Sequence, residues 1–262
     1  MVLNVVKIGG AVLEDSRMRE TFLKRFASLG GPAILVHGGG RTATDIAARL
    51  GVHTRMEGGR RITDADMLEV VTMVYGGLVN KRTVAELQSL GVNAIGLSGA
   101  DLGCVKAHKR PVGEIDYGFV GDVDGVDSRS LSMLLASGAV PVIAPLSFDP
   151  QAGLLNTNAD TIATEVARAM ASGEGPDGRH YDVTLTYCFE KKGVLADPED
   201  DDSVILSIRR EDYARLRESG IVSGGMIPKI DNAFSAIDGG VGKVVITGAM
   251  FLGEGCGTVI CG

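Results

Sequence analysis

The stretch AILVHGGGRTATDIAARL, residues 33–50, contains the pattern that decides the fold of this chain. Its first four residues, Ala33–Val36, form a short apolar run with β-branched members, which predicts a buried strand. His37 and three consecutive glycines follow, and from Thr42 to Leu50 alanine and leucine recur at helical intervals. A strand that runs through a glycine-rich turn directly into a helix is typical of parallel α/β sheets.

The same succession of strand, glycine and helix recurs along the chain. Further strands are predicted at the short apolar runs Val2–Val6, Ala94–Leu97, Val140–Ala144, Val183–Thr186 and Lys243–Ile246. Helical spacing is found at Met18–Phe26, Asp66–Leu90, Ser130–Ser137, Asp160–Met170, Arg209–Glu218 and Ile230–Ile237. The longest of these is expected to be interrupted or closely packed at Gly76-Gly77, and residues 104–123 have the alternating pieces of hairpins. The pattern predicts a largely parallel sheet covered by helices.

Glycine is the unusual component of the composition. The 262 residues include 37 glycines, about 14% of the chain against a usual value of roughly 7%. They follow no three-residue period, which excludes collagen, and they cluster instead at the ends of apolar runs. Paired glycines at such places let a bare backbone approach a ligand, because no side chain stands in the way.

Charge, hydropathy and cysteine usage exclude several classes of protein. Charged residues are 23% and hydrophobic residues 45% of the chain, which excludes wholesale disorder. No apolar run approaches the ~18 residues of a membrane span, and no signal peptide is visible, so no membrane partner is expected. Four cysteines without a CxxC pair favour a cytoplasmic location. The formal net charge of −7 disfavours nucleic acid as a partner.

Several motifs that would assign a function at once are incomplete. Gly242-Lys243 is followed by Val244, and Ile237 stands where a phosphate-binding P-loop needs its first glycine. The glycines of residues 253–257 have no room for the helix of a dinucleotide fingerprint, and residues 96–99 lack the spacing of a hydrolase nucleophile elbow. The four histidines form no HExxH or Cys-His cluster, so no dedicated metal site is predicted.

Two glycine turns at strand ends are candidates for binding an anion. In Lys7–Gly10, a lysine at the carboxyl end of a strand points into the crevice where open α/β sheets bind ligands. In His37–Gly40, three glycines at a helix start would expose several unpaired N–H groups. The alternatives are a surface lysine before a turn and a tight strand–helix turn. An esterase oxyanion hole is a rival function that the missing nucleophile elbow disfavours.

Two further segments place polar or charged groups at the start of a helix. Asn156, Asn158 and Asp160 share one face of an extended segment, which is more than simple capping requires. A turn at residues 224–228, with two glycines and a proline, leaves Lys229 in a first helical turn, where a cation is slightly unfavourable. Capping and a solvated lysine are the respective alternatives.

Together these segments resemble the amino acid kinase family, and more closely its N-acetylglutamate kinase branch. The matching stretches occur in the family's order and span nearly the whole chain. They are Lys7–Gly10, His37–Gly40, Gly59–Asp64, Val79–Lys81, Gly96–Gly99, Asn156–Asp160 and Gly224–Lys229. An ordered set of motifs is far more specific than any one of them alone.

The resemblance implies a fold, a reaction and partners. The fold would be an α/β three-layer αβα sandwich with an open, mainly parallel sheet, in a chain that forms homodimers. Residues 1–153 would form the lobe that binds the acylated amino acid, and residues 154–262 the lobe that binds ATP with Mg²⁺, on one continuous sheet. The implied reaction is ATP-dependent phosphorylation of the γ-carboxylate of N-acetyl-L-glutamate. It gives N-acetylglutamyl 5-phosphate and ADP and belongs to arginine biosynthesis.

The resemblance also implies roles for particular residues. Lys7 and Lys229 would neutralise the transferring phosphoryl group, and Asp160 would orient them. Arg61 would clamp the α-carboxylate of the substrate, for which a guanidinium fork is suited. Further substrate contacts would come from Gly39, Gly40, Asn156 and Asn158. Contacts with the phosphates and the nucleotide would come from Gly9, Gly10, Thr186, Lys192, Ser223 and Gly225.

The segment at residues 185–195 departs from the family pattern. The family reads LTDVxGVL there, whereas this chain reads LTYCFEKKGVL, without the aspartate and with two lysines. This segment normally borders the nucleotide, so any contact by Lys192 is left open.

The chemistry of the reaction is compatible with these residues. A glutamate γ-carboxylate, with a pKa near ~4.3, is already ionised at neutral pH, so its attack on ATP needs no general base. Phosphoryl transfer chiefly requires positioning and positive charge. Within kinases the substrate could instead carry a succinyl or another acyl group, whereas carbamate kinase and aspartokinase match less well. A regulatory module that binds an amino acid or nucleotide without turnover is the alternative from another class.

Overall fold

The central sheet of the protein has eight strands in the part of the chain that the structure describes. A computed structural model describes residues 1–175, 178 and 180–262, and the strand order is β12-β14-β13-β11-β1-β2-β8-β5. The strands are β1 Val2–Ile8, β2 Ala33–His37, β5 Ala94–Leu97, β8 Val140–Ile143, β11 Asp182–Phe189, β12 Ser207–Arg209, β13 Lys243–Gly248 and β14 Thr258–Cys261. All neighbours pair in parallel except β13 and β14, so the predicted mainly parallel sheet is confirmed.

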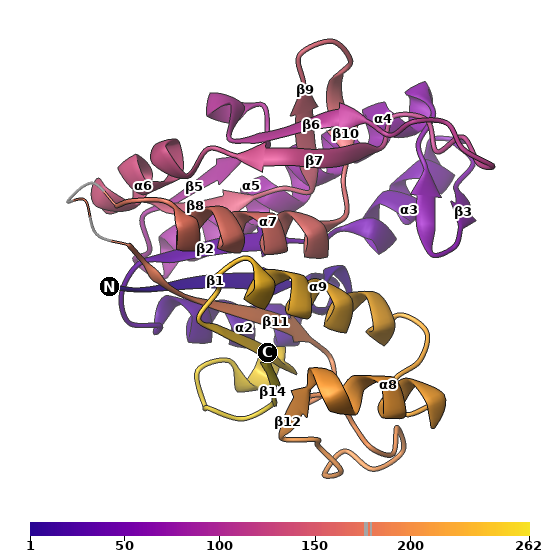
Figure 1. The fold of residues 1–262 in the computed structure, drawn as a ribbon. Coiled ribbons are helices and arrows are strands. Elements are labelled where there is room, and N and C mark those ends of the chain that lie inside the picture. The colour runs from indigo at the N-terminus through magenta and orange to yellow at the C-terminus, as the bar shows by residue number, and fades with distance from the viewer. Residues whose placement is uncertain (176–177, 179) are drawn as a thin grey trace.

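Helices cover both faces of this sheet (Figure 1). One face carries α6 Ser128–Ala136, α7 Ala159–Ser172, α8 Arg210–Glu218 and α9 Met226–Asp238. The other carries α1 Gly10–Glu14, α2 Ser16–Ala27, α3 Gly40–Arg49, α4 Ala65–Val71, η1 Thr72–Val79 and α5 Asn80–Ser89. The expected three-layer αβα arrangement is therefore confirmed.

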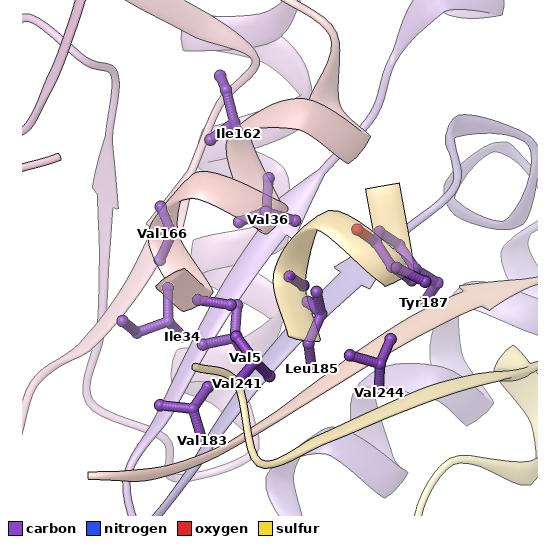
Figure 2. Packing of buried hydrophobic residues seen from close by; sticks show 14 of the residues in the cluster. Val5, Ile34, Val36, Ile162, Val166, Val183, Leu185, Tyr187, Val241 and Val244 are labelled. Atoms are coloured by element: carbon purple, nitrogen blue, oxygen red, sulfur yellow. The ribbon is translucent and has the colours of Figure 1, made fainter. Parts of the chain in front are cut away.

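Each face of the sheet has its own buried core. In β1, Val5 faces the first core and Val6 the second, because successive side chains of a strand point to opposite faces. Figure 2 shows the first core, where side chains of β1, β2, β11 and β13 gather in one cluster with Ile162 and Val166 of α7. Burial on both sides is typical of parallel strands and holds the carboxyl end of β1 in a fixed place.

The segments α4, η1 and α5 form one continuous helical stretch from Ala65 to Ser89. Its middle part, η1, is π-helical and contains Gly76-Gly77, so the predicted long helix changes its geometry, without a break, at the glycines where an interruption or close packing was predicted. Single π-helical turns are frequent at functional sites. Neither this stretch nor any other helix in the described residues is long and apolar enough to cross a membrane.

Smaller strands form a second sheet above the first (Figure 1). Its order is β10-β9-β6-β7, with β6 Val105–Lys109, β7 Gly121–Val126, β9 Leu146–Asp149 and β10 Gly153–Asn156. The hairpin predicted within residues 104–123 is present as the antiparallel pair β6–β7. The short hairpin of β3 Arg55–Glu57 and β4 Arg60–Ile62, and the 3₁₀ turns η2 Asp101–Gly103 and η3 Ala249–Phe251, complete the fold. Residue 153 begins β10, which pairs with β9, so the division of lobes at this residue stays a prediction.

Candidate active site

The glycine turns that follow β1 and β2 touch each other through their backbones. A Cβ atom added to Gly38 would lie 2.9 Å from the Gly10 nitrogen, and one added to Gly10 would lie 3.0 Å from the Gly39 nitrogen. Side chains at these positions would collide with backbone, which explains why the sequence has glycine in both turns. The two strand ends therefore form one continuous surface of bare backbone.

Three amides of these turns have no acceptor among the described residues. They are the N–H groups of Gly10, Gly39 and Gly40. The Gly9 N–H instead donates to the Cys188 carbonyl oxygen at 3.1 Å, within the sheet. Gly9 was expected to offer this amide to a phosphate, but the pairing of β1 with β11 already engages it.

Two lysines and one aspartate from three different elements meet next to these turns. Lys7 Nζ of β1 lies 2.7 Å from Asp160 Oδ1, at the start of α7. Lys229 Nζ, in the first turns of α9, lies 3.7 Å from Asp160 Oδ2. The aspartate thus bridges two cations that are 222 residues apart in sequence (229 − 7). The predicted meeting of these three side chains is what the structure shows.

The charges of this cluster keep the aspartate ionised. Burial of Asp160 opposes its ionisation, but the charges of Lys7 and Lys229 outweigh burial and hold its pKa below the usual value of 3.8. Two cations against one anion leave the cluster with a net positive charge. This charge lies beside the free amides of the glycine turns, so the place is suited to a multiply charged anion.

Asn158 sets the start of α7 and with it the position of Asp160. Its Oδ1 accepts hydrogen bonds from the backbone N–H groups of Asp160, at 2.7 Å, and Thr161, at 3.1 Å. The capping alternative therefore accounts for the side-chain oxygen of Asn158. A contact between Asn158 and substrate stays a prediction.

Arg61 is buried beside the second glycine turn. Its Nη2 donates to the Gly40 carbonyl oxygen and to Thr44 Oγ1, both at 2.8 Å. Its Nη1 donates to Thr54 Oγ1 at 3.2 Å and to Met67 Sδ at 3.8 Å. Both arms of the fork are thus engaged within the protein, and the guanidinium is fixed against the start of α3.

Asn156 is hydrogen-bonded to Thr63, a buried residue for which no individual role was predicted. The Asn156 Nδ2 donates to Thr63 Oγ1 at 2.9 Å, and its backbone N–H donates to the Phe119 carbonyl oxygen. Thr63 is completely buried. Thr63 lies in the Gly59–Asp64 stretch noted from the sequence, but only the fold brings it to Asn156.

The residues expected to contact the nucleotide are spread over the other side of the cluster. Thr186 is buried in β11, whereas Ser223 and Gly225 are exposed before α9. The Gly225 carbonyl oxygen accepts from Lys229 Nζ at 3.3 Å. Lys192 Nζ is exposed and lies 2.5 Å from Asp202 Oδ1, in the acidic run that follows it. In the described part of the chain, Thr186, Lys192 and Ser223 have no hydrogen bond or ion pair with the three-residue cluster.

Tyr75 is a site residue that sequence reasoning missed. It lies in the π-helical segment, and a Cβ added to Gly39 would be 2.9 Å from its ring. No local signal marks it, because an aromatic residue at helical spacing is ordinary core. For metal ions, the described residues contain no group of three or more His, Cys, Asp and Glu side chains that could hold one.

Sequence comparison relates most of the chain to known kinases. Residues 3–248 match the amino acid kinase family. The acetylglutamate kinase of Phocaeicola vulgatus is 55% identical over 258 residues, which are 98% of this chain and 98% of that protein.

Solved structures have the same fold. The crystal structure of smu.665 from Streptococcus mutans UA159 superimposes with a TM-score of 0.80 at 28% identity and covers 98% of both chains. The carbamate kinase of Giardia lamblia bound to AMP-PNP has a TM-score of 0.71 at 13% identity, covering 99% of this chain and 98% of that one. The second likeness concerns the fold alone.

Proposed function

The chain belongs to the amino acid kinase family, and we propose that it transfers the γ-phosphoryl group of ATP to the γ-carboxylate of N-acetyl-L-glutamate. The products are N-acetylglutamyl 5-phosphate and ADP, and the reaction is a step of arginine biosynthesis. One observation carries the proposal: Asp160 holds Lys7 and Lys229 together beside the free amides of Gly10 and Gly39.

These residues meet the main difficulty of the reaction, which is to bring one anion against another. A carboxylate oxygen attacks the γ-phosphorus, a new P–O bond forms, and the bond to the β,γ-bridging oxygen breaks, so that ADP leaves with that electron pair. No proton has to move, because the carboxylate is already ionised at neutral pH. Lys7 and Lys229 offset the charge of the transferring group, while Asp160 keeps both ammonium groups in place. The amides of Gly10, Gly39 and Gly40 add fixed donors.

The acylglutamate would lie on the side of Gly39, Gly40, Arg61 and Asn156. Arg61 attracts the α-carboxylate from a position fixed against Gly40. Because its Nη groups already bond Thr44 and Thr54, a bound carboxylate would replace these hydroxyl contacts. This side belongs to the proposed lobe of residues 1–153, apart from Asn156 and Asn158, which begin the second lobe.

ATP would lie on the side of the proposed lobe of residues 154–262. Thr186, Ser223, Gly225 and Gly10 would approach it. Gly9 would approach it without donating its N–H, which the Cys188 carbonyl oxygen already accepts. Lys192 would reach it after leaving Asp202, with which it pairs in an exposed position. Mg²⁺ would arrive bound to the ATP phosphates, because both oxygens of Asp160 face lysines and the carboxylate is not free as a ligand.

A homodimer would be formed through apolar residues at the β5 edge of the sheet. Met73 and Leu78 of η1 are 53% and 47% exposed, and Ile95 of the edge strand β5 is 37% exposed. Exposed apolar side chains of this kind are typical of interaction surfaces. Light scattering after size exclusion should give twice the mass of the chain, and Leu78→Glu should shift it to the monomer.

Trapping of the acyl phosphate tests the proposed function. The purified protein is incubated with Mg-ATP, hydroxylamine and either N-acetyl- or N-succinyl-L-glutamate, with Lys229→Ala as the matched inactive control. We expect a hydroxamate and equimolar ADP from N-acetylglutamate and less product from the succinyl analogue. The absence of hydroxamate from any acylglutamate would overturn the proposal and favour a module that binds ligand without turnover.

A further inference from the structure

Two buried polar side chains behind the second glycine turn have no role in the function proposed above. His37 is the last residue of β2 and Asn80 the first residue of α5, and both are fully or almost fully buried. Asn80 Nδ2 donates to the Val142 carbonyl oxygen at 2.9 Å and lies 3.1 Å from His37 Nε2. His37 Nδ1 lies 2.8 Å from the Gly38 carbonyl oxygen. The contacts form a chain from β8 to the turn.

Only one placement of protons satisfies all of these contacts. The Val142 carbonyl oxygen can only accept, so the NH₂ group of Asn80 must face it. The other hydrogen of the same NH₂ group points to His37 Nε2, which must accept and therefore carries no proton. The proton of the neutral ring is then on Nδ1, which donates it to the Gly38 carbonyl oxygen.

This hydrogen bond also sets the direction of the Gly39 amide. The peptide between Gly38 and Gly39 is planar and trans, so its N–H points opposite to its C=O. Gly39 N–H is one of the amides with no acceptor among the described residues. Fixing the carbonyl toward His37 therefore fixes the free N–H on the side away from His37, and the Gly39 nitrogen lies 3.0 Å from where a Cβ of Gly10 would be.

We propose that His37 and Asn80 are positioning residues that hold the Gly38–Gly39 peptide so that the Gly39 N–H faces the transferring phosphoryl group. The inference rests on the proposed function, because it assigns the group that this amide serves. A donor that needs no reorientation while charge develops stabilises a transition state more than a mobile one. Asn80 in turn is held against Gly96, where an added Cβ would lie 1.9 Å from its Oδ1.

Two substitutions of His37 separate positioning from packing. His37→Leu fills most of the volume but has no donor, whereas His37→Asn is smaller and keeps an NH₂ group near the place of Nδ1. We expect kcat to fall about 10- to 100-fold in His37→Leu with KM for both substrates within about 3-fold. His37→Asn should retain kcat within about 5-fold although it is the less stable variant. Equal losses of kcat in the two variants would overturn the proposal.

A matched control on the same helix is Thr83→Ala. Thr83 is buried in α5, its Oγ1 donates to the Val79 carbonyl oxygen, and among the described residues it makes no hydrogen bond with His37. Asn80→Ala should lower kcat about 10-fold or more, and Thr83→Ala should lower only stability. A loss of kcat in Thr83→Ala as large as in Asn80→Ala would assign both effects to the fold and overturn the positioning role.

A readout without turnover keeps the two proposals distinguishable. The chain has four histidines, so ¹⁵N-histidine labelling gives few imidazole signals, and His37→Asn identifies the one in question. We expect the neutral Nδ1–H tautomer in the wild-type protein and a mixture of tautomers in Asn80→Ala. An Nε2–H tautomer in the wild type would overturn the inference. An enzyme without acylglutamate turnover but with the Nδ1–H tautomer would refute the proposed function and the assigned target of the amide, while the hydrogen-bond chain would stand.

Discussion

The glycine turns on the two sides of the Asp160 cluster differ in what surrounds them. At Gly10 and Gly38 an added Cβ would meet backbone at 2.9–3.0 Å, whereas at Gly224 and Gly225 it would meet nothing within 4 Å. In the turn before α9, only Gly224, with φ +51°, has a conformation that favours glycine. The turns after β1 and β2 are thus shaped by contacts within the protein, whereas the turn before α9 is open.

The two lysines show the same difference. The side chain of Lys7 is 11% exposed and lies on a strand buried on both faces, whereas Lys229 is 25% exposed and follows the open turn. Lys7 is therefore held on a core strand, whereas Lys229 lies in the first turn of a helix that begins in an exposed turn. Two lysines with the same charge beside one aspartate are therefore expected to contribute unequally to the free energy of unfolding.

Removal of each lysine should have the largest effects on turnover and should affect stability unequally. Lys7→Met and Lys229→Met should each lower kcat about 10³-fold or more, because each removes a charge from the transferring group. Lys7→Met should also lower the free energy of unfolding by about 3 kcal/mol, since it removes the partner 2.7 Å from a buried carboxylate. Lys229→Met should cost less than about 1 kcal/mol. Turnover assays and urea unfolding measure both, and equal losses of stability would refute the distinction.

Alanine substitutions in the glycine turns test whether a Cβ atom is excluded by contacts with the backbone, as expected at Gly38, or is tolerated, as expected at Gly225. Gly38→Ala should lower the free energy of unfolding by about 1–3 kcal/mol, because its Cβ meets the Gly10 nitrogen at 2.9 Å. Gly225→Ala should change it by less than about 0.5 kcal/mol, and any effect should be on KM for ATP. Denaturant unfolding and initial rates check this. A large loss of stability in Gly225→Ala would show that a Cβ does not fit in the turn of residues 224–228.

The loss of stability at acid pH should come in part from His37, which is buried at the end of β2. Burial lowers the pKa of His37 to about 4, below its usual value of 6.5. The unfolded chain then binds more protons than the folded one between pH 6.5 and 4, so stability is lost as pH falls through this range, by up to roughly 3 kcal/mol.

Urea unfolding between pH 7 and pH 4 measures this loss. His37→Leu should remove it, while substitution of the exposed His108, whose pKa is raised by its hydrogen bond to Asp124, should not. A pH dependence that persists in His37→Leu would assign it to other groups.

The smallest effect on stability and turnover is expected for Lys192, which lies in an exposed part of the proposed ATP site. Lys192→Ala should leave the unfolding midpoint unchanged, because its ion pair with Asp202 is exposed. It should raise KM for ATP about 3-fold if the lysine reaches the phosphates. Lys191→Ala is the matched control, since Lys191 makes the same kind of exposed pair with Asp201. Equal KM values in Lys192→Ala and the wild type would remove Lys192 from the nucleotide site.

Local pattern predicted the main strands and most helices, and pairing between distant segments explains what it missed. No strand was predicted at β14 Thr258–Cys261, because the segment is short, and it becomes part of the sheet by its antiparallel pairing with β13. β9 and β10 likewise depend on the hairpin they form together. In the site, the glycines and lysines were predicted from the sequence as site residues. Thr63 and Tyr75 were not, because the residues that they contact are far away in sequence.

The sequence alone determined the order of strand, turn and helix, because apolar periodicity and glycine position are local properties. It also placed lysine and glycine at the end of β1 and at the start of α9, which indicated an anion site, and the ordered set of motifs, through its resemblance to a kinase family, indicated phosphoryl transfer. Only the tertiary structure decided that Asp160 joins Lys7 to Lys229, that the Gly9 amide is engaged in the sheet, and that His37 is held by Asn80. The physical reason is that hydrogen bonds and ion pairs depend on distance in space, which the packing of helices on both faces of the sheet sets.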